Sequence, residues 1–256
     1  MTTTTVVVHP TPDVLAEAVA ARLATRIADA QAARGHAAVV LTGGRIAARF
    51  HAALCQSPVR QAVDWSAVDF WWGDERFLPA GHPERNETQA RDHLLGRLPV
   101  DPARIHPMPA SDTPGCDDPE TAAAEYARQL AEAARGDAQL PQFDVVMLGV
   151  GEDAHVASVF PEQPAIYEER PVVGVRGAPK PPAKRVTLTY PAINSADEVW
   201  LVAAGAGKAD AVALAMSGAG PKQAPAAGVG GVSHTRWLLD RTAAAALPPR
   251  FLSLRR

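Results

Sequence analysis

The 256-residue sequence predicts an α/β fold: a doubly wound, mostly parallel Rossmann-like sheet with helices on both of its faces. Two observations lead to this prediction. Short apolar runs rich in valine alternate with longer segments of helical composition, and several of the apolar runs end at glycine. Hydrophobic residues make up 47% of the chain and charged residues 21%, a balance typical of globular proteins. We therefore expect one α/β domain over residues 1–256, with room for a small additional α/β lobe.

The expected strands are short runs of β-branched, aromatic and other apolar residues, bounded by polar residues, glycine or proline. They lie at residues 6–8, 37–41, 68–72, 143–148, 185–189, 199–203 and 237–239. The run at 143–148 is apolar at every position except Asp144, which is typical of a parallel strand buried on both faces.

The first expected helix has the clearest end signals. Thr11 and Pro12 suit its start, and Gly35 can end it after Arg34. Further helices are expected at 46–54, 87–95 and 119–135, in a first helical turn at 156–160, and in the alanine-rich segment after residue 239. The segments 174–183 and 217–231 are rich in proline, glycine and alanine and are expected to be loops.

Composition excludes several classes of protein. A net charge of −3 provides no basic field for nucleic acid, so an anionic ligand has to be held by a few placed cations. Cys55 and Cys116 have no CxxC spacing, so neither a disulfide framework nor a zinc site is indicated. No apolar run approaches the ~20 residues that a membrane helix needs, and the N-terminus lacks the basic flank of a signal peptide. We expect a soluble, cytoplasmic protein.

The most informative motif follows the apolar run at 143–148. Two glycines come first, and then Glu152, Asp153 and His155 arrive within four residues. Open α/β sheets place ligand sites at the carboxyl ends of their strands. An imidazole, with an unperturbed pKa of ~6.5, can accept a proton from water near neutral pH. His155 is therefore the candidate base, and Asp153 or Glu152 could orient its ring or stabilise its charged form.

Two glycines and an arginine, Gly43, Gly44 and Arg45, lie between an expected strand and an expected helix. Glycines let a backbone approach a ligand closely, and the N-terminus of the following helix favours an anion. The segment matches neither a Walker A nor a GxGxxG motif, so nucleotide binding is not indicated. Taken alone, a tight turn without a ligand explains it equally well.

Charged residues also follow the strand at 68–72. Asp74 and Arg76 come directly after it, and Arg85 lies downstream. The two arginines could hold a phosphate or carboxylate with their planar guanidinium groups. The alternative is a network of surface ion pairs that only closes a loop.

Two further cations belong to the same pattern. Lys208 lies at an expected strand-to-helix junction, close to the carboxyl ends of the other strands. Arg185 opens an expected strand, and a plain charge at the edge of the sheet is the alternative for it.

In order and spacing, these blocks resemble the 6-phosphogluconolactonase family, within a wider group that includes glucosamine-6-phosphate deaminase. The segment 42–44 resembles its Ser/Thr-Gly-Gly loop, and 72–76 with 85–86 resembles its W-G-D-E-R…R-N block. The segment 149–161 resembles its G-x-G-x-D-G-H-x-A-S-x-F-P signature. The segments 185–189 and 205–209 resemble its last two blocks, so the resemblance covers nearly the whole chain.

The resemblance implies hydrolysis of 6-phospho-D-glucono-1,5-lactone to 6-phosphogluconate, the second step of the oxidative pentose phosphate pathway. It implies that His155 is the general base and that Asp153 and Glu152 support it. The implied substrate-binding residues are Gly43, Gly44, Arg45, Asp74, Arg76, Arg85, Arg185 and Lys208. A lactone carbonyl is a good electrophile, so we expect no metal and no cofactor. The implied ligand is a phosphorylated sugar lactone, and the sequence indicates no protein partner.

One departure from the family signature concerns Ala154, where the signature has glycine. If this position has a positive φ, alanine strains the loop by ~1 kcal/mol or more.

Two alternatives to the lactonase remain. A deaminase or isomerase of the same fold also carries an acid near Asp74 and an Asp-x-His triplet, but Arg76, Arg85 and Arg185 favour the lactonase. A sugar-phosphate sensor without catalytic activity would be marked by loss of the base, and His155 is present.

Overall fold

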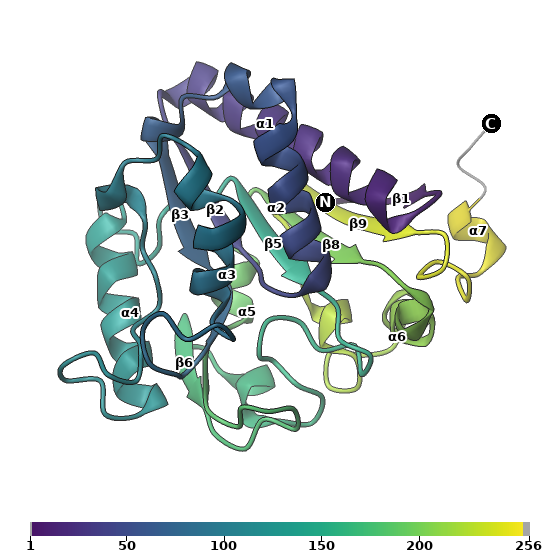
Figure 1. Ribbon diagram of the computed structural model, residues 1–256. Helices are drawn as coiled ribbons and strands as arrows, with labels where there is room; N and C mark the ends of the chain where they lie inside the picture. The colour runs from purple at the N-terminus through teal and green to yellow at the C-terminus, as the bar shows by residue number, and fades with distance from the viewer. Residues whose placement is uncertain (1, 253–256) are drawn as a thin grey trace.

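The computed structural model describes residues 2–252 and contains a six-stranded sheet in which all neighbouring strands are parallel. The strand order is β1-β9-β8-β5-β2-β3 (Figure 1). These strands are β1 Thr3–His9, β2 Ala37–Leu41, β3 Val68–Trp72, β5 Val145–Gly149, β8 Glu198–Ala203 and β9 His234–Asp240. The predicted parallel sheet is confirmed.

Helices flank this sheet. Figure 1 shows α1 and α2 packed side by side over one face, whereas α5 lies behind the sheet. The helices are α1 Pro12–Arg34, α2 Arg45–Gln56, α3 Asn86–His93, α4 Pro119–Ala133, α5 Tyr190–Ile193, α6 Ala209–Met216 and α7 Pro249–Leu252.

Burial determines which strands are central. All five residues of β2 and all six of β8 are buried, and so are the first four of β5. Continuous apolar burial is the pattern of parallel strands covered on both faces. In the register of the sheet, Val39 and Val40 lie opposite Val145 and Val146.

The ends of α1 follow the predicted signals. The side chain of Thr11 accepts a hydrogen bond from the backbone N–H of Val14, and Pro12 begins the helix. Gly35 follows the last turn with φ of 77°, a left-handed conformation that glycine adopts without strain. These signals could be read correctly because they are local.

The order of the strands reverses between β2 and β5. From β2 the chain continues outward to β3, and from β5 it continues in the opposite direction to β8 and β9. Connections that leave in opposite directions open a crevice at the carboxyl ends of the two strands. The loops after β2 and β5 therefore meet where a ligand site is expected.

A second, three-stranded antiparallel sheet lies beside the first and has the order β4-β7-β6. Its strands are β4 Asp74–Arg76, β6 Val172–Val175 and β7 Arg185–Leu188, and α4 packs against β6 and β7. Gly73 alone separates β4 from β3, and its carbonyl accepts a hydrogen bond from the N–H of Leu188. The two sheets are thus joined directly, while a single domain over 1–256 stays a prediction.

This second sheet corrects two expectations. The strand expected at 185–189 exists, but it pairs antiparallel in the small sheet and not with the parallel strands. The segment 174–183 is not loop throughout, because β6 includes its first two residues. Strands of three or four residues in a small sheet depend on their partners and leave little periodicity in the sequence.

The prediction of a helical turn at 156–160 is wrong. This segment forms turns around an isolated bridge between Val156 and Val159, and Ala157 has φ of 49°. The N–H of Ser158 donates to the hydroxyl of Thr187, and its own hydroxyl donates to Asp74. These long-range hydrogen bonds replace the ones that a helix would make.

The prediction of an alanine-rich helix that begins soon after residue 239 is also wrong. Successive turns follow β9, and only the short α7 comes later. The Asp240 carboxylate accepts hydrogen bonds from the Gly205 and Ala243 N–H groups and from the Thr242 hydroxyl. The short polar side chain thus closes a turn where alanine composition favoured a helix.

Among residues 2–252, no helix combines the length and the apolar character needed to cross a membrane.

The buried Tyr126 provides a test of how α4 is attached to β3. The Tyr126 hydroxyl of α4 accepts a hydrogen bond of 2.9 Å from the N–H of Trp72 in β3. Tyr126→Phe should lower the free energy of unfolding by about 1–3 kcal/mol, because the buried N–H loses its partner. Urea unfolding measures the change. Tyr167→Phe is the matched control, because Tyr167 is 64% exposed; equal effects of the two substitutions would contradict the role of this bond.

Candidate active site

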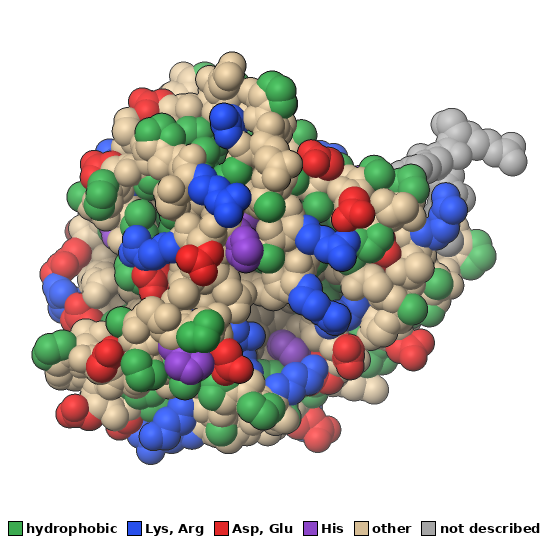
Figure 2. Space-filling view, in the orientation of Figure 1, with side chains coloured by type: hydrophobic (Ala, Val, Ile, Leu, Met, Phe, Trp, Pro, Cys, Tyr) green, Lys and Arg blue, Asp and Glu red, His purple; other side chains and the backbone are tan. Residues whose placement is uncertain are grey.

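A cavity of about 340 Å³ opens at the carboxyl ends of β2, β5 and β8, the edge of the sheet where the strand order reverses. The loops after these three strands form much of its wall. The small sheet contributes Asp74, Arg76 and Arg185, and α3 contributes Asn86. Figure 2 shows a hollow on this face with lysine and arginine side chains around it and a histidine inside.

The turn between β2 and α2 brings backbone close to the cavity. A Cβ atom on Gly43 would lie 1.9 Å from Oδ1 of Asn86, and Gly44 has φ of 98°. Both positions therefore require glycine. The N-terminus of α2 begins immediately after them, with Arg45 exposed at its first position. A helix N-terminus with free N–H groups favours an anion.

The loop after β5 presents His155. Its Nδ1 lies 2.5 Å from Oδ1 of Asp153, and its carbonyl accepts a hydrogen bond from the Gly151 N–H. A Cβ atom on Gly151 would lie 2.0 Å from Nδ1, so this glycine makes room for the ring. Ala154 has φ of 62°, so the strain expected from the missing glycine is present.

The Asp153 carboxylate determines which ring nitrogen is free. Partial burial tends to raise its pKa, but the hydrogen bond with His155 and the nearby charges of His155 and Lys180 hold it well below its usual range. An ionised Asp153 accepts a hydrogen bond from an N–H at Nδ1. In the neutral ring, Nε2 is then left as the acceptor, as a general base requires.

Asp74 forms a second acidic group in the wall. Its carboxylate accepts hydrogen bonds from the Ser158 hydroxyl at 2.6 Å and from the Asn86 side-chain amide at 3.2 Å. Nη1 of Arg185 lies 3.9 Å away. These partners hold the carboxylate in one orientation, from which it can accept a hydrogen bond from a ligand hydroxyl.

Two buried polar atoms in the wall have no hydrogen-bond partner within residues 2–252. They are Nε of Arg76 and Oδ1 of Asn86. Such groups are rare in folded proteins, and a polar ligand in the cavity could hydrogen-bond to them. Another nitrogen of Arg76 donates to the carbonyl of Glu84, which fixes the side chain at the rim.

The far side of the cavity carries Lys208. Burial lowers the pKa of its ammonium group, and the nearby Glu152 carboxylate partly opposes this effect. The charges of Lys180 and Arg45 also lower it, so three cations face one region. This concentration of positive charge is suited to a phosphate group.

Most of the predicted site residues lie together. His155 and seven of its predicted companions line the cavity or lie at its edge: Gly43, Gly44, Arg45, Asp74, Arg76, Arg185 and Lys208. Asp153 reaches the cavity through its contact with His155, while Glu152 is exposed and does not line it.

Arg85 is placed elsewhere. It is buried, and its guanidinium donates to the carbonyls of Leu78 and Met108 at 3.2 and 2.7 Å. It also lies 3.7 Å from Glu75. Arg85 therefore holds the chain that surrounds α3, and it is not part of the cavity wall.

Sequence reasoning missed Lys180, which lines the cavity and lies 3.5 Å from Asp153. It belongs to a proline-rich segment that was expected to be loop, and no local signal marks it. Asn86 carried a signal, because it follows Arg85 in the block that was singled out.

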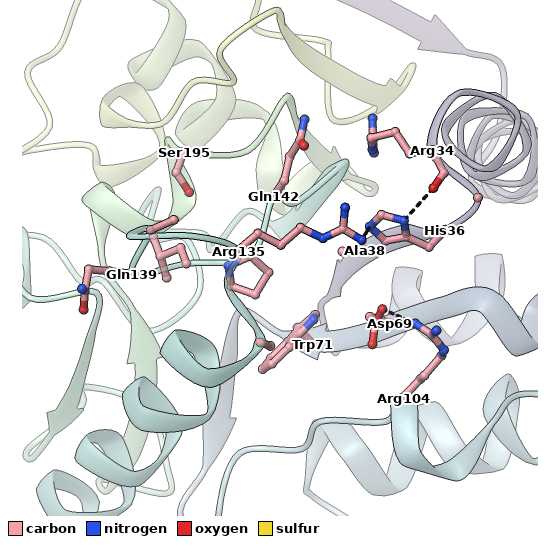
Figure 3. A pocket seen from close by; sticks show the side chains of 15 residues that line it. Arg34, His36, Ala38, Asp69, Trp71, Arg104, Arg135, Gln139, Gln142 and Ser195 are labelled. Atoms are coloured by element: carbon pink, nitrogen blue, oxygen red, sulfur yellow. Dashed lines mark hydrogen bonds and ion pairs between the residues drawn. The ribbon is translucent and has the colours of Figure 1, made fainter.

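A larger cavity of about 900 Å³ lies at the opposite end of the sheet (Figure 3). Its charged groups mostly bind one another: Arg104 lies 2.7 Å from Asp69, and Arg135 contacts His36 at 3.4 Å. It lies at the amino ends of β2 and β3, where open α/β sheets rarely bind ligands. The smaller cavity, with its His155–Asp153 pair, is the better candidate.

Comparison with known proteins shows the family to which the chain belongs. A family model described as glucosamine-6-phosphate isomerases/6-phosphogluconolactonase matches residues 10–237. A 6-phosphogluconolactonase of Streptomyces coelicolor is 59% identical over 245 residues, which cover 94% of each chain. One of Mycobacterium tuberculosis is 45% identical over 242 residues, covering 94% of this chain and 97% of that protein.

Solved structures show the same fold. The 6-phosphogluconolactonase of Trypanosoma brucei superposes with a TM-score of 0.84 at 28% identity, over 97% of this chain and 100% of that one. A monomeric glucosamine-6-phosphate deaminase superposes with a TM-score of 0.76 at 20% identity, over 94% and 99% of the two chains. The fold alone therefore does not separate these two activities.

The close approach at Gly151 gives a test of the His155 geometry. Gly151→Ala should displace the imidazole from Asp153, because the new methyl group would overlap Nδ1. The proton of such a short, charge-assisted hydrogen bond gives a strongly downfield NMR resonance, which should disappear in this variant. Gly220→Ala is the control, since a Cβ atom there meets no atom within 4 Å. A resonance unchanged by Gly151→Ala would contradict the geometry.

Proposed function

We propose that this chain, which belongs to the family of glucosamine-6-phosphate isomerases and 6-phosphogluconolactonases, hydrolyses 6-phospho-D-glucono-1,5-lactone to 6-phospho-D-gluconate. The observation that carries the proposal is the His155–Asp153 pair facing a cavity surrounded by cations. Two relatives named 6-phosphogluconolactonase, at 59% and 45% identity over nearly the whole chain, support the lactone as substrate. The reaction belongs to the oxidative pentose phosphate pathway, and we place it in the cytoplasm.

His155 acts as the general base. Its Nε2 accepts a proton from a water molecule while the water oxygen attacks the lactone carbonyl carbon. Asp153 keeps the other ring nitrogen protonated and stabilises the imidazolium that forms. The bond between the carbonyl carbon and the ring oxygen then breaks, and the imidazolium returns its proton to the leaving alkoxide. The resulting carboxylic acid then releases its remaining proton to water, so the products are a carboxylate and a free hydroxyl group.

The cations hold the charged end of the substrate. The phosphate group binds near Arg45 and Lys208, beside the backbone of Gly43 and Gly44 at the N-terminus of α2. Asp74 accepts hydrogen bonds from sugar hydroxyls, because its carboxylate is already fixed by Ser158 and Asn86. Each step uses side chains of this chain and water, so the proposal includes no metal and no cofactor.

The second candidate is deamination of glucosamine 6-phosphate. The family model names isomerases of this sugar phosphate, and a deaminase shares the fold. The first experiment follows the decay of freshly generated 6-phosphogluconolactone in buffer with a chelator, after subtraction of the uncatalysed hydrolysis. No acceleration, together with ammonia release from glucosamine 6-phosphate, would replace the first candidate by the second.

Removal of the base should slow the chemical step without weakening substrate binding. His155→Ala should lower kcat by ~10²–10⁴ with little change in KM, because the imidazole acts on the attacking water. Steady-state kinetics of lactone hydrolysis measure both constants. His36→Ala, at the far cavity, is the control and should leave both unchanged. Full turnover by His155→Ala would remove this residue from the mechanism.

Lys208→Met should affect binding and stability in opposite directions. KM should rise about 10–150-fold, because a charge-assisted hydrogen bond to phosphate contributes about 1.5–3 kcal/mol. The unfolding midpoint should rise slightly, because burial lowers the pKa of this ammonium and the folded state therefore disfavours its charge. Kinetics and thermal unfolding measure the two effects. An effect on kcat alone would refute the role in phosphate binding.

A further inference from the structure

We propose that Lys180 is a positioning residue of the active site, which acts through Asp153 on His155, and that Arg185 holds Lys180 in place. The inference rests on the proposed function, because it concerns the base assigned there. It also changes the expected role of Arg185, from a contact to the substrate to the anchor of a loop.

Lys180 and His155 bind the same carboxylate oxygen. Nζ of Lys180 lies 3.5 Å from Oδ1 of Asp153, and Nδ1 of His155 lies 2.5 Å from that oxygen. The ammonium is therefore within about 6 Å of the imidazole. Lys180 comes from the loop between β6 and β7, whereas Asp153 and His155 come from the loop after β5.

Arg185 uses most of its donors on the loop of Lys180. Its Nε donates to the carbonyl of Pro182 at 3.1 Å. Its Nη2 donates to the carbonyls of Lys180 and Pro181, both at 3.0 Å. A guanidinium has five N–H groups, and backbone carbonyls take three of them here. Only Nη1 remains, and it faces Asp74 at 3.9 Å.

The buried position of Arg185 suits an anchor. It is 5% exposed, and Cζ of its guanidinium lies 5.7 Å from the ring centre of Phe160. Phe160 also contacts the proposed base, because the centroids of the Phe160 and His155 rings lie 4.5 Å apart. Arg185 thus connects the loop of Lys180 to the segment that packs against His155.

A cation near the imidazole has a defined effect on the base. It repels the positive charge that the ring gains when it accepts a proton, and it helps to keep the Asp153 carboxylate ionised. The other charged groups that line the cavity are Arg45, Asp74, Arg76 and Lys208, together with Arg185 itself. The side chain of Lys180 is 44% exposed, so the effect is partly screened by solvent and salt.

The first test is the pH profile of kcat/KM for Lys180→Met, which removes the charge and keeps a chain of similar length. The acidic limb of the profile should move to higher pH by ~0.5–2 units at low salt. This is the effect of one charge at ~6 Å for effective dielectric constants between ~80 (water) and ~20 (protein surface). Turnover at saturating substrate should fall by only ~2–10-fold. Lys180→Arg should restore the limb. Lys184→Met is the matched control, because Lys184 is exposed on the same loop and does not line the cavity.

The second test needs no substrate. The titration midpoint of the His155 ring, followed by NMR and assigned with His155→Gln, should rise in Lys180→Met and stay unchanged in Lys184→Met. Arg185→Met should raise it as well, because the loop loses its anchor; if that variant does not fold, the Lys180 variants decide. A failure of lactone hydrolysis in the wild-type protein would overturn the proposed function and leave this measurement intact.

Three results would overturn the inference. An unchanged acidic limb and an unchanged midpoint in Lys180→Met would show that Lys180 does not act on His155. A rise in KM without a shift would make Lys180 a ligand for the substrate anion. Turnover slowed by a factor of ~10²–10³ without a shift would make it a donor to the oxyanion.

Discussion

The rest of the site depends on the hydrogen bonds that the Glu75 carboxylate accepts from the backbone. Glu75 is completely buried, and it accepts hydrogen bonds from the backbone N–H groups of Arg76, Asn86 and Glu87 at 2.7–2.9 Å. It therefore joins β4 to the N-terminus of α3, where free N–H groups favour a carboxylate. Asn86 is held in consequence, and it contacts both Asp74 and the turn at Gly43.

The three charged residues of β4 therefore have different tasks. Glu75 points inward and organises α3, whereas Asp74 and Arg76 line the cavity. This division follows from the alternation of side chains along a strand, which sends neighbours to opposite faces. Parallel strands supply the base and the anion-binding turn, and the small antiparallel sheet supplies the acid and two arginines.

The sequence predicted the features that depend on local chemistry. The parallel strands are continuous apolar runs, and α1 has a capping threonine, a proline and a terminal glycine. The glycines after β2 and β5 marked the loops that meet at the cavity, because strands of a parallel sheet end at the same edge. The sequence accordingly places Gly43, Asp74 and His155 at one edge of the sheet.

The remaining features depend on partners far away in the chain or on the exact course of a loop. Arg185 looked like a substrate ligand, but it uses its donors on backbone carbonyls three to five residues before it. Arg85 looked like a second phosphate ligand and is buried against Met108. The segment 156–160 has a sequence compatible with a helix, and only its contacts with Thr187 and Asp74 oppose one. No local pattern records such contacts.

The loop that carries His155 contains alanine in a left-handed conformation on both sides of the base. Ala154 and Ala157 have φ of 62° and 49°, and each such residue costs about 1–2 kcal/mol relative to an unstrained backbone. The methyl group of Ala154 is completely buried, and its carbonyl accepts a hydrogen bond from the N–H of Ala226. Contacts with the surrounding structure are therefore needed to keep the loop in this strained conformation. The strain at these two residues lowers the free energy of opening the loop, relative to a loop with the same contacts and an unstrained backbone.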